Sequence, residues 1–292
     1  MPKNSQDRKE PQIRKRFNPL NDYIFQRVMG EKGDEEWLLA FINAVLERTG
    51  KNNLTSIEIV ENKKLTAETI GGKSGVLDVR ATTDKGEKVN IEVQLSDEKN
   101  LQRRSLYYWA REYAAGIDEG DNYEELPTVF AINIVDFGLI KTGGVHTSFH
   151  IREDEDKECI LSDALEIHFL DMSKFRRLKN PDVNSNIIHR WLTFFDEKAD
   201  ERRLKEVIKM DASIAKANEK MIKLTNDPEV LRAYDMHILA KRSEISRIQL
   251  AEEKGIAIGK MATARSLKSL GSSPEFIAQA TGLSIEEIEA LK

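Results

Sequence analysis

The chain has 292 residues, enough for one large or two ordinary domains, and its 40% hydrophobic content allows a sizeable core. Charged residues make up 33% of the chain, above the ~25% of an average globular protein, but the net charge of -5 excludes an overall basic signal for nucleic acid. Residues 1–16 differ, because they hold six cations and two acids, a net charge of +4. We expect this basic arm to be a flexible, solvated terminus that could add nonspecific affinity for phosphate.

Cysteine content and hydropathy narrow the class of protein further. Cys159 is the single cysteine, which excludes an intrachain disulfide and a zinc site built from several cysteines. The sequence has no signal-peptide pattern and no apolar run near the ~18–20 residues that span a bilayer. We therefore expect a soluble protein of the cytoplasm, a reducing compartment.

The first two thirds of the chain alternate between helical and strand patterns. The elements that we expect, in chain order, are helices at 22–29 and 35–47, a strand at 56–65, a hairpin at 76–95, a helix at 98–117, and strands at 128–137, 147–152 and 166–170. The strand at 128–137 is strongly apolar and long enough to be central in a sheet. This order of elements predicts an α/β domain.

The hairpin at 76–95 carries the strongest chemical signal. Both arms alternate apolar and polar residues with period two, as half-buried strands do, and the loop contains a glycine. With the turn centred near Lys85, Asp78 lies opposite Glu92, and Gln94 shares a face with Glu92. Two converging carboxylates can hold one hard divalent cation such as Mg2+. The alternative is a solvated polar face, and a one-residue slip in register would part the pair.

These residues resemble a known signature. Asp78 followed by Glu92-x-Gln94 is similar to the motif of PD-(D/E)XK nucleases, with Gln in place of the usual Lys. The stretches at 18–30 (NPLNDYIFQRVMG) and 103–109 (RRSLYYW) strengthen the resemblance. Together the motifs resemble the Rpn group of that superfamily, the recombination-promoting nucleases often labelled transposases.

The resemblance covers about residues 17–190 and implies a fold in which helices flank a mixed sheet. It also implies a metal-dependent DNA endonuclease that hydrolyses phosphodiester bonds, linked to recombination, mobile elements or defence. Asp78, Glu92 and the backbone carbonyl of Val93 would hold Mg2+, or Mn2+, which would polarise the phosphate and activate a water. Two alternatives stay open: a catalytically inactive DNA-binding or regulatory protein that keeps the fold, and a helical scaffold protein.

Other residues complete the expected site. Gln94 can hydrogen-bond water or phosphate but has no positive charge, so another group must stabilise the developing charge. Arg104 is the candidate for this role, and Arg103 is the second choice. The resemblance places Asp22 as a third acidic group, and its alternative role is a helix N-cap.

The histidines give no comparable signal. His146 and His150 share a face in a helix or a strand. We assign them no metal role, because the sequence places no acidic or cysteine partner beside them.

The final third of the chain is expected to be helical throughout. Asp227-Pro228-Glu229 begins a long, charged helix that runs to about Lys254. We expect it to pack on a partner helix of the same chain or of a second copy, which would make a homodimer. The apolar side chains that would be buried are Val230, Leu231, Tyr234, Ile238, Ile245, Ile248 and Leu250.

A helical hairpin follows near the end of the chain. Ser284-x-x-Glu287 is a capping box, and 277–284 is similar to the turn of helix-turn-helix modules. The last helix is acidic and would repel phosphate, so we favour an interaction or dimerisation module. The predicted division is therefore a basic arm at 1–16, a nuclease-like domain at 17–195 and a helical region at 196–292.

Overall fold

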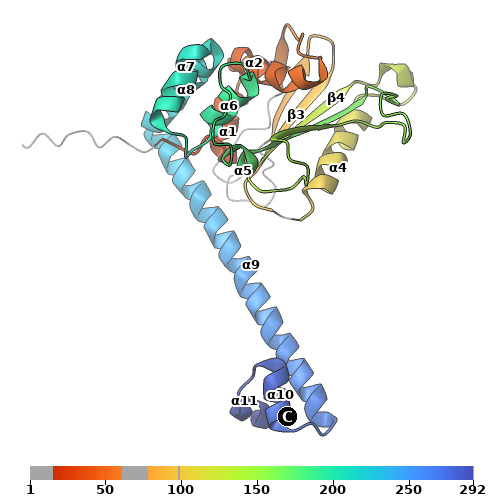
Figure 1. The fold of residues 1–292 in the computed structure, drawn as a ribbon, viewed down its shortest axis with the longest axis vertical. Helices are drawn as coiled ribbons and strands as arrows, with labels where there is room; N and C mark the ends of the chain where they lie inside the picture. The colour runs from red at the N-terminus through yellow and green to blue at the C-terminus, as the bar shows by residue number, and fades with distance from the viewer. Residues whose placement is uncertain (1–15, 61–77, 98, 292) are drawn as a thin grey trace, which may run out of the picture. The chain divides into compact units, whose positions relative to one another are not determined.

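The structure, a computed structural model, describes residues 16–60, 78–97 and 99–291. The chain divides into two compact units, which we call the core unit (Met1–Tyr234) and the tail unit (Asp235–Lys292). The core unit contains every strand of the described chain (Figure 1).

A six-stranded mixed sheet forms the centre of the core unit. Its strands, in order across the sheet, are β1 (Ile57–Ile59), β2 (Val79–Thr83), β3 (Lys88–Gln94), β4 (Val129–Val135), β6 (Leu165–Asp171) and β5 (His146–Phe149). β4 runs parallel to both of its neighbours, whereas the other neighbouring pairs are antiparallel. All residues of β4 are buried, which confirms the prediction of a central strand.

Helices cover both faces of this sheet (Figure 1). They are α1 (Asp22–Met29), α2 (Glu35–Leu46), α4 (Leu101–Ala114), α5 (Met172–Phe175), α6 (Ile187–Phe195), α7 (Glu201–Met210) and α8 (Ala212–Asn226), with short 3-10 helices η1 (Glu47–Thr49) and η2 (Tyr123–Glu125). Alternate residues of β4 point to the two faces of the sheet. Phe130 and Ile132 belong to the main core together with residues of α1, α2 and α6, whereas Ala131 packs with Leu101 of α4 on the opposite face. α4 therefore covers one face, and the other helices cover the opposite face.

The predicted elements and their order are confirmed, with differences at their ends. The strand expected at 56–65 appears as β1, and its residues from 61 onward lie outside the described chain. The long helix, α9 (Pro228–Ser269), begins as predicted but spans 42 residues and continues well past Lys254. It passes through Gly255 and Gly259, each of which costs a helix only about 1 kcal/mol relative to alanine.

The core unit extends beyond the boundary expected at residue 195. α7 and α8 belong to it, because Val207, Ile214, Ala217 and Met221 are buried in the main hydrophobic core. Lys220 of α8 also reaches Asp34 at the start of α2, with Nζ 2.5 Å from a carboxylate oxygen. The expected division at 195/196 therefore falls inside one compact unit.

The start of the described chain is also attached to the core unit. Arg16, the last residue of the expected arm, donates from Nη2 to the carbonyl of Phe194 at 2.9 Å. Its guanidinium lies 4.7 Å from the centre of the Phe194 ring. Residues 1–15 of that arm lie outside the described chain.

The tail unit contains the end of α9 followed by α10 (Pro274–Thr281) and α11 (Ile285–Ala290). Its small core holds Ala264, Ile277 and Ile288. The predicted capping box at Ser284 is present. Lys268 donates to the carbonyls of three residues at the end of α11, where a positive charge also complements the helix dipole.

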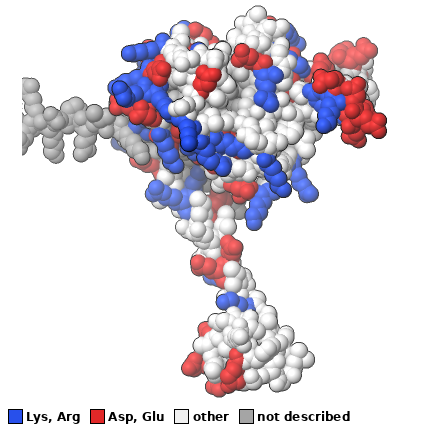
Figure 2. Space-filling view, in the orientation of Figure 1, with Lys and Arg blue, Asp and Glu red and all other residues white. Residues whose placement is uncertain are grey.

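Two surface properties follow from this arrangement. Among the described residues, no helix combines the length and the apolar character needed to cross a bilayer, α9 included. Cations and acids are mixed over the core unit, but acidic side chains gather at the end of the sheet where β4 and β6 begin (Figure 2).

The packing of α8 can be tested with two neighbouring residues. Met221→Ala should lower the free energy of unfolding by about 2–4 kcal/mol, because its side chain is only 1% exposed within the main core. Ile222→Ala is the matched control: this side chain is 52% exposed, so the change should stay within about 0.5 kcal/mol. Urea denaturation of the full chain measures both. Equal effects would contradict the docking of α8 on the core unit.

Candidate functional site

The β2–β3 hairpin brings Asp78 and Glu92 together. Val79 pairs with Ile91 in the antiparallel ladder, so one further step along both strands sets Asp78 opposite Glu92. The predicted register, centred on Lys85, is therefore confirmed. We call Asp78 and Glu92 the acid pair.

Asp78 and Glu92 face each other at a non-hydrogen-bonded position of the ladder, where opposed side chains are closer than at hydrogen-bonded positions. The carbonyl of Arg80 accepts from Val60 N at 2.8 Å, and the carbonyl of Gln94 accepts from Asp136 N at 3.1 Å. Because backbone groups alternate sides along a strand, even-numbered residues of β2 and β3 turn their backbone groups away from the ladder between them. Opposed residues of this non-hydrogen-bonded kind have Cα atoms about 4.5 Å apart. By the same alternation, the carbonyl of Val93 faces the β2 side.

The polar face of the hairpin is buried, not solvated. Asp78 and Glu92 are each only 7% exposed. Burial raises the pKa of Asp78 to about 7, and the negative charge of Glu92 contributes to the rise, while Arg104, Arg111 and Arg80 oppose it. The acid pair is thus a strained arrangement of two like charges, which a bound cation would relieve.

α4 brings a positive charge to the acid pair. Arg104 donates from Nη2 to Glu92 Oε1 and to Gln94 Oε1, both at 2.5 Å. The next residue, Ser105, is buried and donates from Oγ to Asn133 Oδ1 at 2.6 Å. Since Asn133 is the β4 partner of Glu92, this bond fixes α4 on the sheet at the level of the acid pair. Arg104, the predicted candidate, is therefore held where its charge acts on Glu92.

The structure adds three residues that the sequence analysis left out or treated as secondary. Arg80 follows Asp78 by two residues and shares its sheet face. On α4, Arg104, Tyr108 and Arg111 succeed one another by four and three residues, which places them along one side of the helix. This spacing was visible in the sequence, but nothing there indicated that this side of α4 would face the hairpin.

Tyr108 and Arg111 contact each other beside the acid pair. The guanidinium carbon of Arg111 lies 5.2 Å from the ring centre of Tyr108. Burial raises the pKa of Tyr108, and the negative charges of Glu92 and Asp78 contribute to the rise. Both residues therefore line the site, Tyr108 as an uncharged hydroxyl.

Two predicted residues stand apart from this cluster. Asp22 lies in the first turn of α1, but the N-cap is Asn21, whose side chain accepts from Ile24 N, so the N-cap alternative for Asp22 was wrong. Its role as a third acidic group stays a prediction. Arg103 is exposed on α4, and Arg104 is the one of the two arginines that contacts Glu92.

The donor atoms suit a small, hard cation. Within residues 16–60, 78–97 and 99–291, no group of three or more His, Cys, Asp or Glu side chains is arranged to hold a metal ion. The protein can therefore supply the two carboxylates of the acid pair and a backbone carbonyl, with water completing the shell. Mg2+ is bound in this way in many sites, because it gives up its water reluctantly.

The observed fold is that of the class the resemblance indicated: a mixed α/β sheet flanked by helices, with the acid pair on a hairpin that leads into α4, as in PD-(D/E)XK nucleases. Residues 19–251 match the family described as "PD-(D/E)XK nuclease family transposase", and the chain belongs to this family. The match includes α7 and α8, in agreement with the extent of the core unit. No curated protein and no solved structure matches the chain.

The strain in the acid pair predicts an unusual pH dependence of stability. The pKa of Asp78 in the folded chain, about 7, lies above the ~3.9 of an unfolded chain. Between these values the folded protein keeps a proton that the unfolded chain has lost, so stability falls as pH rises. Without divalent metal, Asp78→Asn should therefore raise the free energy of unfolding at pH 7.5 by an amount on the order of a few kcal/mol. The variant should have a higher Tm than the wild type at this pH and the same Tm near pH 4.

Thermal denaturation across this pH range measures the difference. Glu58→Gln is the control, because Glu58 is exposed on β1 of the same sheet and its substitution should leave the pH profile unchanged. A difference between Asp78→Asn and wild type that stays constant from pH 4 to pH 8 would contradict a strained acid pair.

Proposed function

We propose that this protein is a metal-dependent DNA endonuclease that hydrolyses phosphodiester bonds at the acid pair. The observation that carries the proposal is the burial of Asp78 and Glu92 side by side, at a cost in stability that serves no purpose in packing. Two neighbouring buried carboxyl groups, one of them with a strongly raised pKa, are typical of a binding or catalytic site. Membership of a nuclease family gives the chemistry.

In this proposal Asp78, Glu92 and the Val93 carbonyl hold Mg2+ or Mn2+. When bound, the ion polarises the scissile phosphate and lowers the pKa of an attacking water. Gln94 positions that water or a phosphate oxygen through its amide. Arg104 supplies the positive charge that Gln94 lacks, because its guanidinium lies 2.5 Å from both Glu92 and Gln94.

The family description also supports a role in moving DNA. Transposition and recombination both require cleavage of DNA strands, so we assign the activity to mobile-element or recombination chemistry, carried out in the cytoplasm. The runner-up is a protein that binds DNA with this fold and does not cut. One observation favours it: Arg104 already forms an ion pair with Glu92 at 2.5 Å, which competes with a metal ion.

Cleavage of a supercoiled plasmid separates the two functions. With Mg2+ or Mn2+ the wild type should nick the plasmid, and Asp78→Ala and Glu92→Ala should each lose about 100-fold or more in rate, because the metal contributes several kcal/mol to transition-state stabilisation. Glu58→Gln, an exposed acid on the same sheet, should cut like the wild type. Circular dichroism confirms that each variant is folded. If the wild type binds the plasmid but does not cut it, the result favours the alternative of a DNA-binding protein without nuclease activity.

We further propose that α9 pairs with α9 of a second copy. From residue 241 to residue 263 every side chain of the helix is exposed, including large apolar ones such as Ile248 at 61% and Ile258 at 68%. From Ile245 onward, apolar and small residues recur at intervals of three or four along one side, at Ile245, Ile248, Ala251, Gly255, Ile258 and Ala262, and Ile238 lies seven residues before Ile245. A mean spacing near 3.5 residues is typical of the seam of a coiled coil, the side of a helix that packs against its partner. An isolated helix gains little stability without such packing.

This seam differs from the stripe expected from the sequence. Val230 is buried in the core of its own core unit, and Leu231 and Tyr234 pack against the same core. Leu250 follows Ile248 by two residues, about 200° around the helix, so it lies on the opposite side. The surface available to a second copy therefore runs from Ile238 to Ala262.

Sedimentation of the full chain tests this pairing. The wild type should be a dimer at micromolar concentration, and Ile245→Asp combined with Ile248→Asp should give a monomer, because the charges would be buried in the seam. Leu250→Asp is the matched control, an equally exposed apolar residue on the other side of the helix, and should remain dimeric. A monomeric wild type would refute the proposal, as would a dimer that survives the double substitution.

A further inference from the structure

A second polar cluster lies on the face of the sheet that α4 does not cover. In β6, Ile167 and Phe169 pack with α4's hydrophobic cluster, so the alternating residues Glu166 and His168 point to the opposite face. Glu166 and His168 are both 0% exposed. The cluster is thus separated from the acid pair by the sheet itself.

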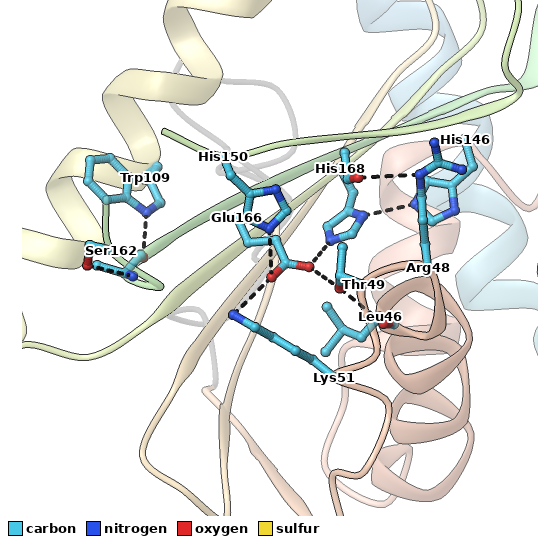
Figure 3. Close-up of polar contacts among 12 residues, drawn as sticks. Leu46, Arg48, Thr49, Lys51, Trp109, His146, His150, Ser162, Glu166 and His168 are labelled. Carbon is cyan, nitrogen blue, oxygen red and sulfur yellow. Dashed lines mark hydrogen bonds and ion pairs between the residues drawn. The ribbon is translucent and has the colours of Figure 1, made fainter. Parts of the chain in front are cut away.

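Glu166 organises this cluster (Figure 3). Its Oε1 accepts from Thr49 Oγ1 at 2.5 Å and from His168 Nε2 at 2.8 Å. Its Oε2 lies 3.1 Å from Lys51 Nζ and 3.3 Å from His150 Nε2. One buried carboxylate therefore holds four donors, which come from β6, from η1, from the loop after η1 and from the residue that follows β5.

The histidines behind Glu166 are uncharged. Although burial alone would raise it, the hydrogen bonds from His168 and Thr49 hold the pKa of Glu166 at about 2. Burial lowers the pKa of His168 and takes that of His146 to about 3. His168 Nε2–H donates to Glu166, and His146 Nε2 lies 2.9 Å from His168 Nδ1. This chain of bonds is a rigid support rather than an acid–base relay.

Three residues that contact Glu166, namely Thr49, Lys51 and His150, line an open cavity of about 680 Å³. The residues that line it include three permanent cations, a histidine and two hydroxyls against a single exposed acid: Arg48, Lys51, Arg152, His150, Thr49, Ser148 and Asp163, with Ile160 as an apolar wall. We call this space the Arg48 cavity. Its charge pattern is the reverse of that at the acid pair.

Two of the cations retain donors for a ligand. Arg48 uses Nε on Ser148 Oγ at 3.3 Å, and Arg152 uses Nη1 on the carbonyl of Lys157. Across the described part of the chain, neither guanidinium forms an ion pair with a carboxylate. Lys51, in contrast, is already paired with Glu166. Planar guanidinium groups with open donors are the preferred protein groups for phosphate oxygens.

We propose that the Arg48 cavity binds a small phosphorylated ligand, with Arg48 and Arg152 on the phosphate and Ser148 as a further donor. A polymer such as DNA fits poorly. The bridge between Arg152 and Ile160 closes the acidic turn at 153–158, and acidic side chains gather at this end of the sheet (Figure 2). These charges repel an extended polyanion, whereas a single phosphate group can lie between the arginines.

Titration calorimetry with inorganic phosphate and with adenosine monophosphate tests the site. The full chain is used without divalent metal, so that metal-mediated binding of phosphate at the acid pair does not contribute. Adenosine monophosphate should bind and adenosine should not. Arg48→Gln and Arg152→Gln should each weaken phosphate binding about tenfold or more, because each removes a charge-assisted contact.

Arg203→Gln is the matched control. Arg203 is an exposed arginine of α7 that also donates to a backbone carbonyl, that of Lys179, so its loss should leave phosphate affinity unchanged. Absence of saturable binding by the folded wild type would overturn the proposal, as would equal weakening in the control. A short DNA duplex that displaces adenosine monophosphate from Arg48 and Arg152 would overturn the assignment to a small ligand and identify a DNA contact instead.

Discussion

The structure of the core unit depends on one costly arrangement, the burial of two carboxylates opposite each other on a non-hydrogen-bonded strand pair. Asp78 and Glu92 repel each other, and burial deprives both of water. The surroundings compensate in part: α4 is fixed to the sheet by Ser105 and Asn133, which brings Arg104 onto Glu92. The position of α4, and hence of every side chain beside the acid pair, follows from this need to oppose buried negative charge.

The buried carboxyl groups on the two faces of the sheet have pKa values shifted in opposite directions. On the α4 face, burial and the negative charge of Glu92 raise the pKa of Asp78 to about 7. On the other face, the pKa of Glu166 is about 2, because the carboxylate is satisfied by hydrogen bonds. The strained acid pair is suited to take up a cation. The satisfied Glu166 instead supports a wall of cations, which is suited to take up an anion.

The charged C-terminal third has two distinct roles that composition does not separate. α7 and α8 complete the core unit with a few buried residues such as Val207, Ile214 and Met221. α9 then leaves that core and exposes its apolar side chains over residues 241–263. A stripe of isoleucines on a long, solvated helix has no partner within the described tail unit, whose own small core is formed by Ala264, Ile277 and Ile288. Pairing between copies would give two acid pairs in one assembly, as double-strand cleavage requires.

The sequence by itself determined what depends on neighbours in the chain. A short loop and a period of two were sufficient to set Asp78 opposite Glu92, and local caps were sufficient to place α10 and α11. The hydrophobic run of β4 predicted its central place, because only a strand covered on both faces is apolar throughout.

Tertiary structure decided the contacts between distant segments. Tyr108 and Arg111 lie beside the acid pair only because α4 packs on the sheet with their side of the helix facing the strands, and helical spacing does not reveal which side that is. Thr49 and Glu166 are 117 residues apart and meet because α2, which leads into η1, packs on the face of the sheet to which Glu166 points. His150 was likewise judged to lack an acidic partner, although Glu166 lies 3.3 Å away. Residues so far apart in sequence are paired by the sheet order, which no local pattern encodes.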